Sequence, residues 1–419
     1  MIKRSFFALS QPRLHYDLLE PDPKEPESIP VPASLTLLIH EEIDSGKQAL
    51  IQKGDPVQQG EKIKLYEDST VYAISPVSGT IKLFDTYSDD FGNTATYVII
   101  THDPAKPTEP SSFTPEETLE FADDFLRTLP GDLPFETLAR KDLKIDTIVV
   151  TCSDTDILST SNQFIACKYA EEIKKGALLL KKITGVTKLC LTLPENLDLE
   201  SEFTNFLVFK TSPDYPSALP AMVMKDHLNM VPVPGKTPEE QGVCFIRPEA
   251  LVSLSRVYES RKPVFEKIIT VMDKTGSQRR VKAVIGTPLS KILNTFNIHV
   301  NEMDRIIIGG PMTGFATFTP HHPVVGDMDM VIVQDRDIVP ELSDYPCINC
   351  GKCVRICPAN VPVNILVRYL EADQYEEAAD KYDLESCIEC GLCAYVCTAR
   401  IPLYQYIRLG KHELMSLRA

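Results

Sequence analysis

The sequence contains no tryptophan, no long apolar run and no excess of basic residues. The lack of tryptophan excludes nothing by itself. No run approaches the roughly 20 apolar residues that cross a bilayer, so we expect no membrane-spanning helix. The formal net charge of −16 argues against nucleic acid and anionic lipid as partners, because their phosphates repel such a surface. What remains is a globular protein of 419 residues, long enough for about three or four domains.

Two copies of one cysteine spacing, C-x2-C-x2-C-x3-C, lie near the C-terminus. This spacing is typical of chains that wrap [4Fe–4S] clusters, because three thiolates from one tight loop reach three irons and the fourth cysteine ligates the other cluster. We therefore expect two clusters, and closely spaced clusters of this kind pass electrons singly. The predicted ligands are Cys347, Cys350, Cys353 and Cys397 for one cluster, and Cys387, Cys390, Cys393 and Cys357 for the other.

Other uses of these cysteines fit the spacing less well. Disulfides need an oxidising compartment, and we recognise no signal peptide. Zinc sites usually combine two C-x2-C pairs that a longer loop separates. The remaining cysteines, at positions 152, 167, 190 and 244, are scattered, so we expect them to be free thiols, mostly buried. Oxygen-sensitive clusters and free thiols both suit a reducing cytoplasm.

The composition divides the chain into segments. Short apolar runs that alternate with glycine-containing turns predict a small β-sandwich or barrel, and a later alternation of helical and apolar segments predicts a mostly parallel sheet. The expected segments are an extended proline-rich arm (1–33), a small β domain (34–108), an α/β domain (112–250), a mixed α and β domain (251–336) and a two-cluster domain (337–419).

Several elements are predicted from periodicity and capping. Thr114 is the expected N-cap of the first helix, and the amphipathic stretch between the cysteine runs is expected to shield the clusters. The main elements are helices at Pro115–Leu129, Ser161–Ile183 and Pro362–Tyr382 and strands at Ala49–Ile51, Leu143–Thr151, Val186–Leu193, Glu202–Lys210 and Arg305–Ile308. A glycine-rich turn at Gly309, Gly310 and Gly314 suits either a ligand or a sharp structural corner.

The small β domain resembles the barrel-sandwich fold of biotinyl and lipoyl carriers. The resemblance rests on the string from Lys53 to Ile63 and on the string from Ile74 to Ile81. Carriers present a lysine at a hairpin tip, but the corresponding turn between Tyr66 and Val71 reads Glu-Asp-Ser-Thr. We therefore expect a structural module rather than a carrier.

The whole order of segments resembles the RnfC family, the C subunits of Rnf-type ferredoxin:NAD oxidoreductase complexes. Ile285–Leu293 and Ile308–Phe315 look like that family's β-grasp segment, with the cysteine runs close behind. The resemblance implies an α/β multidomain fold: a barrel-sandwich hybrid domain, a Rossmann-like α/β domain like that of the complex I flavoprotein, an SLBB-like β-grasp domain and a helical ferredoxin-like domain. It also implies that the α/β domain binds FMN and NADH.

The motifs that would bind these nucleotides depart from the family's pattern in this sequence. The flavin loop keeps one glycine, Gly131, which lies between Pro130 and Asp132; proline lacks a donor and aspartate repels phosphate. The acidic motif appears as Thr151–Asp156, where Asp154 and Asp156 replace longer carboxylates and an asparagine is lost. Two further motifs survive in part, at Tyr215-Pro216-Ser217-Ala218 and at Phe245–Glu249. We expect neither FMN nor NADH to bind.

The resulting hypothesis is an electron-transfer subunit of a membrane-associated, Rnf-like redox complex. It would relay electrons rather than act as a stand-alone catalyst, so we assign no catalytic residue. A ferredoxin, a cytochrome or a flavoprotein would be its donor or acceptor, and other subunits would attach it to the cytoplasmic side of the membrane. Two alternatives stay open: an NADH:FMN oxidoreductase subunit with a divergent pocket, and a structural adaptor with vestigial clusters.

Overall fold

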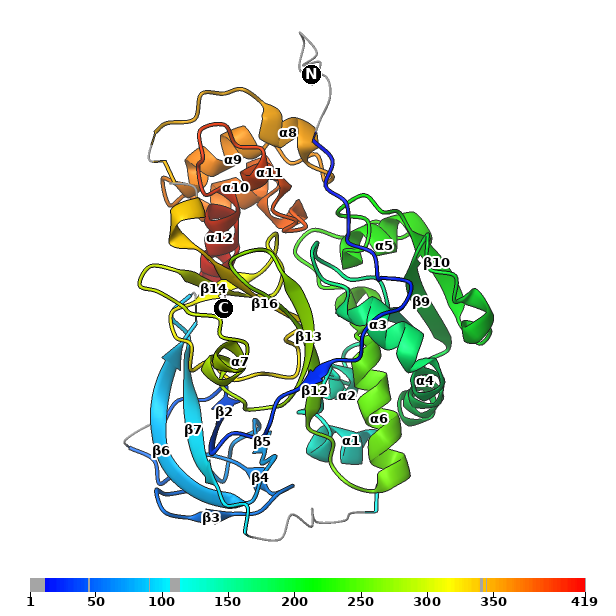
Figure 1. Cartoon of the computed structure of the whole chain (residues 1–419). Coiled ribbons are helices and arrows are strands. Elements are labelled where there is room, and N and C mark those ends of the chain that lie inside the picture. The colour runs from blue at the N-terminus through cyan, green and yellow to red at the C-terminus, as the bar shows by residue number, and fades with distance from the viewer. Residues whose placement is uncertain are drawn as a thin grey trace.

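The computed structural model describes residues 12–43, 46–89, 91–105, 114–339, 342–343 and 345–418. Figure 1 shows four folded units within these residues: a barrel-sandwich unit (blue), an α/β unit (green), a central unit of strands and one short helix (yellow), and a helical cysteine unit (orange and red). The central unit touches the cysteine unit at one end and the barrel-sandwich unit at the other. Across the described part of the chain, every helix is too short or too polar to traverse a bilayer.

The N-terminal segment from residue 12 to residue 33 runs extended along the α/β unit toward the central unit (Figure 1). Strand β1 (Glu27–Ser28) pairs in parallel with β13 (Gln278–Val284) at the edge of the central sheet. Farther upstream, the backbone N–H of Leu19 donates to Oε1 of Gln163 at 3.1 Å. These contacts join the segment to two units that are distant in sequence.

The barrel-sandwich unit consists of short antiparallel strands around an apolar core. Residues 49–51, which were predicted to form a strand, lie outside regular structure, because only the backbone N–H of Leu50 pairs with a neighbour, the carbonyl of Leu65. The strands are β2 (Ser34–Ile39), β3 (Pro56–Val57), β6 (Gly79–Ser88) and β7 (Thr94–His102), in the order β2-β7-β6-β3, with β4 (Lys62–Ile63) and β5 (Ala73–Ile74) as a separate pair.

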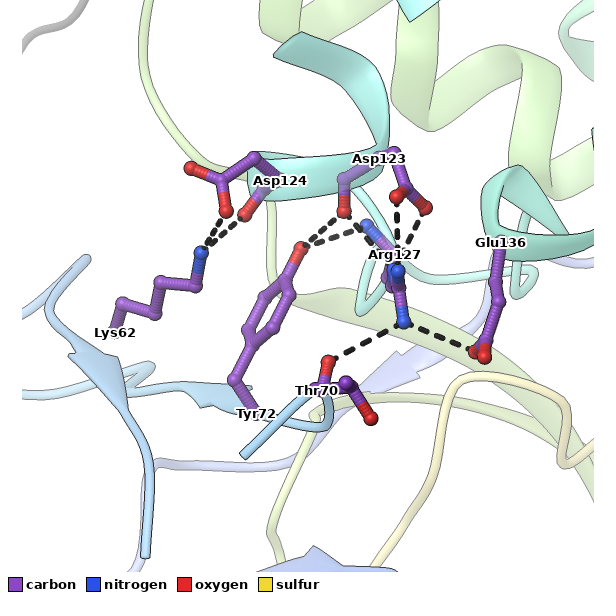
Figure 2. Close-up of polar contacts among 7 residues, drawn as sticks. All are labelled: Lys62, Thr70, Tyr72, Asp123, Asp124, Arg127 and Glu136. Atoms are coloured by element: carbon purple, nitrogen blue, oxygen red, sulfur yellow. Dashed lines mark hydrogen bonds and ion pairs between the residues drawn. The ribbon is translucent and has the colours of Figure 1, made fainter. Parts of the chain in front are cut away.

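The β4–β5 connection of this unit is held against the α/β unit rather than presented to solvent. Figure 2 shows Tyr72 and the Thr70 carbonyl beside Arg127, while Lys62 reaches Asp124. The Tyr72 hydroxyl donates to the Asp123 carbonyl at 3.2 Å and accepts from the Arg127 backbone N–H at 3.4 Å. These contacts immobilise the turn at which carrier domains present their lysine, in keeping with a structural role.

The α/β unit is built on four parallel strands with helices packed on its faces, as the alternation predicted. The strands are β8 (Thr147–Thr151), β9 (Lys188–Pro194), β10 (Leu207–Thr211) and β11 (Val243–Ile246), in the order β10-β9-β8-β11. The helices are α1 (Leu119–Phe125), α2 (Phe135–Ala139), α3 (Ser161–Lys168), α4 (Ala170–Thr184), α5 (Pro220–His227) and α6 (Pro248–Ser260), with short 3₁₀ turns at Glu200–Phe203 and Glu239–Gln241.

Several predictions for this unit were wrong at element boundaries; the strand predicted from Leu143, for example, starts only at Thr147. The first helix begins after Thr118, not Thr114, because the Thr118 hydroxyl accepts the Phe121 N–H at 3.2 Å. The helix predicted over 161–183 is two helices, α3 and α4, divided at Tyr169, whose backbone leaves the helical region. The strand predicted from Glu202 starts only at Leu207, because the preceding residues form a 3₁₀ turn with Phe203 fully buried.

The central unit contains a mixed six-stranded sheet that also receives β1 from the arm. Its strand order is β1-β13-β12-β16-β14-β15, and helix α7 (Leu289–Thr295) packs on it through Leu289, Ile292 and Leu293. The remaining elements are β12 (Glu266–Met272), β14 (Arg305–Ile308), β15 (Phe315–Thr317), β16 (Met330–Gln334) and a 3₁₀ turn at Arg336–Ile338.

A buried ion network joins the α/β unit to the central unit. The Lys267 side chain is 0% exposed and lies between the carboxylates of Glu249 and Asp329. Arg247 donates to Asp329 at 2.8 Å, and Glu249 accepts the Ile268 N–H at 2.8 Å. Burial alone would lower the pKa of Lys267, but the two carboxylates raise it, so the ammonium group stays charged. Glu249, which ends the family-like segment Phe245–Glu249, therefore stabilises the interface between the α/β unit and the central unit.

Removing Lys267 should destabilise the protein strongly. In Lys267→Met, the buried Glu249 carboxylate loses the ammonium group paired with it, while Asp329 loses Lys267 but keeps its bond to Arg247. Breaking a buried pair in this way costs about 3–5 kcal/mol. We expect a clear fall in the thermal unfolding temperature, measured by circular dichroism. Lys47→Met is the matched control, because the Lys47–Asp68 pair is exposed and should contribute almost nothing. Equal melting temperatures for the two variants would contradict the proposed importance of the network.

Candidate iron–sulfur site

The cysteine unit folds as two similar halves. Helices α8 (Lys352–Ile356) and α11 (Leu392–Tyr395) each begin directly after a glycine, Gly351 and Gly391, with φ of 69° and 72°. The other helices are α9 (Val363–Leu370), α10 (Tyr375–Tyr382) and α12 (Leu403–Arg418), with a 3₁₀ turn at Leu384–Ser386. The single helix predicted over 362–382 was wrong, because the chain turns between α9 and α10, where the Gln374 N–H bonds back to the Tyr369 carbonyl.

The first cysteine of each run accepts the same backbone hydrogen bond. The Asn349 N–H lies 3.4 Å from Cys347 Sγ, and the Glu389 N–H lies 3.4 Å from Cys387 Sγ. Both donors occupy the left-handed region, with φ of 55° and 53°, which turns the amide toward the sulfur. Amides directed at sulfur stabilise the negative charge of a bound cluster and tune its potential. The repeated sequence thus produces a repeated local geometry.

The eight thiols converge in two separate cavities. Ile348, Val367 and Leu403 complete the wall of the first cavity, and Val363, Tyr404 and Ile407 complete that of the second. Four thiols in an apolar cavity fit the donor set and the low-dielectric surroundings of a [4Fe–4S] cluster. Cys347, Cys350, Cys353 and Cys397 line one cavity, and Cys357, Cys387, Cys390 and Cys393 line the other. The assignment of these two sets as cluster ligands stays a prediction.

The two sets differ in exposure. In the first set Cys350 is exposed, and the neighbouring Ile348 is 66% exposed. In the second set Cys390 and Cys393 are buried, and burial raises the pKa of Cys390 to about 12. Because only the thiolate binds iron, loading this set must release protons. The first set therefore lies at the protein surface, and the second lies against the other units.

Side chains from distant segments support the second cysteine loop. The Tyr215 hydroxyl donates to the Cys390 carbonyl at 2.8 Å. Lys411 on α12 donates to the Cys387 carbonyl at 2.6 Å and to Glu389 at 2.7 Å. Sequence reasoning missed both roles: Tyr215 was noted only as a family remnant, and nothing in the sequence around Lys411 indicates its contact.

A larger cavity, of about 420 Å³, lies where the α/β, central and barrel-sandwich units meet. It opens at the carboxyl ends of the parallel strands, the edge at which open α/β sheets bind ligands. Arg247 and Arg408 contribute positive charge to its wall. The carboxylates outnumber them, and they are Asp89, Asp154, Asp156, Asp327 and Asp329. Such a surface opposes a ligand with phosphate groups.

Comparisons with known proteins agree with this architecture. The model of the RnfC barrel sandwich hybrid domain matches residues 21–105, and that of the 4Fe–4S dicluster domain matches residues 346–401. The C subunit of the ion-translocating oxidoreductase complex of Vibrio cholerae is 24% identical over 373 residues. The C subunit of the proton-translocating ferredoxin:NAD(+) oxidoreductase complex of Clostridium ljungdahlii is 24% identical over 409 residues. The chain is thus similar to RnfC-family proteins along most of its length.

The lengths of these relatives differ. The alignment covers 92% of this chain and 89% of the Clostridium ljungdahlii protein. With the Vibrio cholerae protein it covers 84% of this chain but 48% of the relative, so the chain spans about half the length of that protein. Among solved structures, an NAD+-reducing [NiFe]-hydrogenase matches with a TM-score of 0.45 and 13% identity, covering 74% of this chain and 62% of that chain. The two family models and the relatives confirm the resemblance to the RnfC family, the barrel-sandwich domain and the dicluster domain.

In this RnfC-like chain, the acidic motif after β8 binds the protein's own backbone. Asp156 accepts hydrogen bonds from the Met312 N–H at 3.2 Å and from the Thr313 N–H and hydroxyl at 2.7 Å. A Cβ at Gly310 would overlap the Asp156 carboxylate. The glycine-rich turn therefore encloses Asp156, and its conformation is explained without a bound ligand.

Asp154 is also fully engaged within the protein. It accepts the Ser159 hydroxyl at 2.9 Å, the Asn162 N–H at 3.0 Å and the Gln163 side-chain amide at 3.1 Å, which together fix the start of α3. Burial raises its pKa, against the lowering effect of these donors. Its oxygens consequently serve the helix start and the arm that Gln163 holds.

The segment that resembles the family's flavin loop directs its amides inward. The Gly131 N–H donates to the Gly326 carbonyl at 2.8 Å, and the Asp132 N–H donates to the Leu129 carbonyl at 3.0 Å. A Cβ at Gly131 would collide with the backbone of Ala250, so this glycine is needed for packing onto α6. Amides that already have carbonyl partners are not available to a phosphate.

Replacement of single cysteines should separate the two cluster sites. Cys357→Ser should remove the cluster predicted to lie in the buried cavity, and bound iron should fall from about eight to about four atoms per chain. Adding Cys387→Ser should cause no further loss, whereas adding Cys347→Ser should remove the rest. Iron analysis and paramagnetic resonance after dithionite reduction measure both effects. Cys167→Ser, outside both runs, is the control. Full iron loss in the Cys357→Ser, Cys387→Ser pair would refute the assignment.

Proposed function

We propose that this chain is the electron-transfer subunit of an Rnf-like, membrane-associated redox complex. Two [4Fe–4S] clusters, held by the two sets of four cysteines, would pass single electrons between a partner and the rest of the complex. The observation that carries the proposal is the convergence of eight thiols into two separate sets of four within one small helical unit. The relatives' names, which describe subunits of ion-translocating oxidoreductase complexes, support the assignment to such an assembly.

The proposal includes the absence of an NADH or FMN site in this chain. Three features support it: the Gly131 turn has its amides paired with carbonyls, the Asp156 carboxylate is bonded to the glycine-rich turn, and the cavity wall is acidic. Each removes something that a nucleotide phosphate requires, either a free donor or a favourable potential. The residues at the carboxyl ends of the parallel strands would then serve to position the second cysteine loop.

A second candidate function is an NADH:FMN oxidoreductase subunit with a rebuilt pocket. One observation favours it: a cavity of about 420 Å³ persists at the carboxyl edge of the parallel sheet. That volume is within the range of about 300–1,000 Å³ found for small-molecule sites. The name of the Acetobacterium woodii relative, which is 23% identical, also contains ferredoxin:NAD(+) oxidoreductase.

The proposed location is the cytoplasmic side of the membrane, with attachment through other subunits of the complex. Ferredoxin, a cytochrome or a flavoprotein are the proposed donors and acceptors. The proposed domains keep the sequence-based boundaries: an arm (1–33), a barrel-sandwich hybrid domain (34–108), a Rossmann-like domain (112–250), an SLBB-like β-grasp domain (251–336) and the two-cluster domain (337–419).

The visible spectrum of the anaerobically reconstituted protein tests the proposal. We expect the broad absorption of iron–sulfur clusters without a flavin band, no bleaching on addition of NADH, and paramagnetic signals after reduction by dithionite. A stoichiometric flavin band that NADH bleaches would establish the second candidate instead. An absence of paramagnetic signals with full iron loading would point to a structural adaptor and would contradict any relay.

A further inference from the structure

A groove of about 940 Å³ lies between the α/β unit and the cysteine unit, away from the central cavity. One wall is formed by α5 and the proline-rich segment Val231–Pro238 that follows it. The opposite wall is the outer face of α12 together with the second cysteine loop. Figure 1 shows α5 at the end of the α/β unit that is nearest to the cysteine unit. The functions considered so far leave this groove without a role.

The groove directly adjoins the second set of thiols. Cys387, Ile388 and Glu389 line both the groove and the cavity of that set. Pro358, next to Cys357 in the sequence, lines the groove as well. A molecule seated here would touch a residue that is proposed to bind the cluster, with no intervening layer of protein.

The groove is positively charged although the chain as a whole is acidic. Its wall carries five Lys and Arg side chains against two carboxylates, Glu385 and Glu389, while the net charge of the chain is −16. Lys411 pairs with Glu389, and Arg418 pairs with Glu385, so both carboxylates are neutralised. Lys225 and Lys236 are exposed, and neither forms an ion pair with a described residue. The surplus positive charge therefore faces solvent on the α/β side.

Phe91 and Arg408 line both the groove and the central cavity and thus separate them. Phe91, on the β6–β7 connection, stacks on His412 with ring centroids 4.6 Å apart and an interplanar angle of 7°. The Arg408 guanidinium lies 4.9 Å from the Phe91 ring centroid. An occupant of the groove would consequently reach the second cysteine loop without entering the central cavity.

Apolar side chains on the rim favour a protein as the occupant. Val231 is 81% exposed, Met415 is 65% exposed and Val233 is 44% exposed. A small molecule inside the groove would leave these side chains in water, whereas a protein surface laid over the rim would bury them. Apolar contacts combined with complementary charge are typical of protein interfaces, and the charge speeds association.

We propose that this groove is the docking site for an acidic, one-electron carrier protein. The inference rests on the proposed relay function and names the side of the chain at which one partner binds. In the step, the reduced carrier loses one electron and is oxidised, and the cluster proposed at Cys357, Cys387, Cys390 and Cys393 gains that electron, with no proton or bond transferred. The exposed first set, around Cys350, is left for the other partner.

Charge reversal at the two exposed lysines tests the proposal. In Lys225→Glu, Lys236→Glu, binding of an oxidised plant-type [2Fe–2S] ferredoxin, measured by calorimetry at low ionic strength, should weaken by at least about tenfold. The rate of electron transfer from the reduced ferredoxin should fall by a similar factor and lose its dependence on salt. The binding measurement requires no electron transfer, so its result does not depend on whether the clusters are redox-active.

The matched control is Lys53→Glu, Lys262→Glu, which makes the same change of charge at exposed lysines outside the groove. Equal affinity and rate in the two double variants would overturn the proposal. FMN is the second probe: stoichiometric FMN binding that Lys225→Glu, Lys236→Glu abolishes, with ferredoxin binding unchanged, would identify a small-molecule site instead. Reduction by dithionite should be the same in every variant; failure of that reduction in the wild type would contradict the relay itself, not the docking site.

Discussion

The hydrogen bonds that Asp156 accepts from the glycine-rich turn hold the site together. The carboxylate follows strand β8 of the α/β unit, and its partners Met312 and Thr313 belong to the central unit. The same turn supports the second cysteine loop: a Cβ on Gly391 would lie 2.5 Å from the Met312 carbonyl oxygen, and the Tyr404 hydroxyl donates to the Thr313 carbonyl at 3.2 Å. A buried carboxylate without these donors would be strongly unfavourable, so three units are fixed relative to one another.

The distribution of charge follows from the same arrangement. Carboxylates that hold the units together converge on the central cavity, while lysines and arginines from α5 and α12 converge on the outer groove. The two spaces share Phe91 and Arg408 as a wall. An acidic chain therefore presents a cationic hollow beside Cys387, the cysteine that connects the groove to the buried thiols. The electrostatics thus favour an electron partner at the groove over a nucleotide in the cavity.

Sequence reasoning succeeded where the chemistry is local. The β14 strand was predicted with its observed bounds, Arg305–Ile308, because its apolar, β-branched residues follow one another directly in the sequence. It failed at element boundaries, where several residues could cap or break a helix: Thr118 rather than Thr114 caps α1, and at Tyr169 one expected helix becomes two. The sequence also showed that the motifs of the α/β unit depart from the family pattern. It did not show which contacts within the protein the residues of these motifs make.

The sequence by itself indicated the grouping of the eight cysteines into two sets and the resemblance to the RnfC family. Ligand spacing within a loop of a few residues restricts which thiols can meet, and the order of segments is a linear property of the chain. Only the tertiary structure decided that Glu249 pairs with Lys267, that Tyr215 supports the Cys390 carbonyl and that the second set is buried beside a cationic groove. These depend on contacts between residues that are far apart in sequence, where burial and the need to pair every buried charge select the partner.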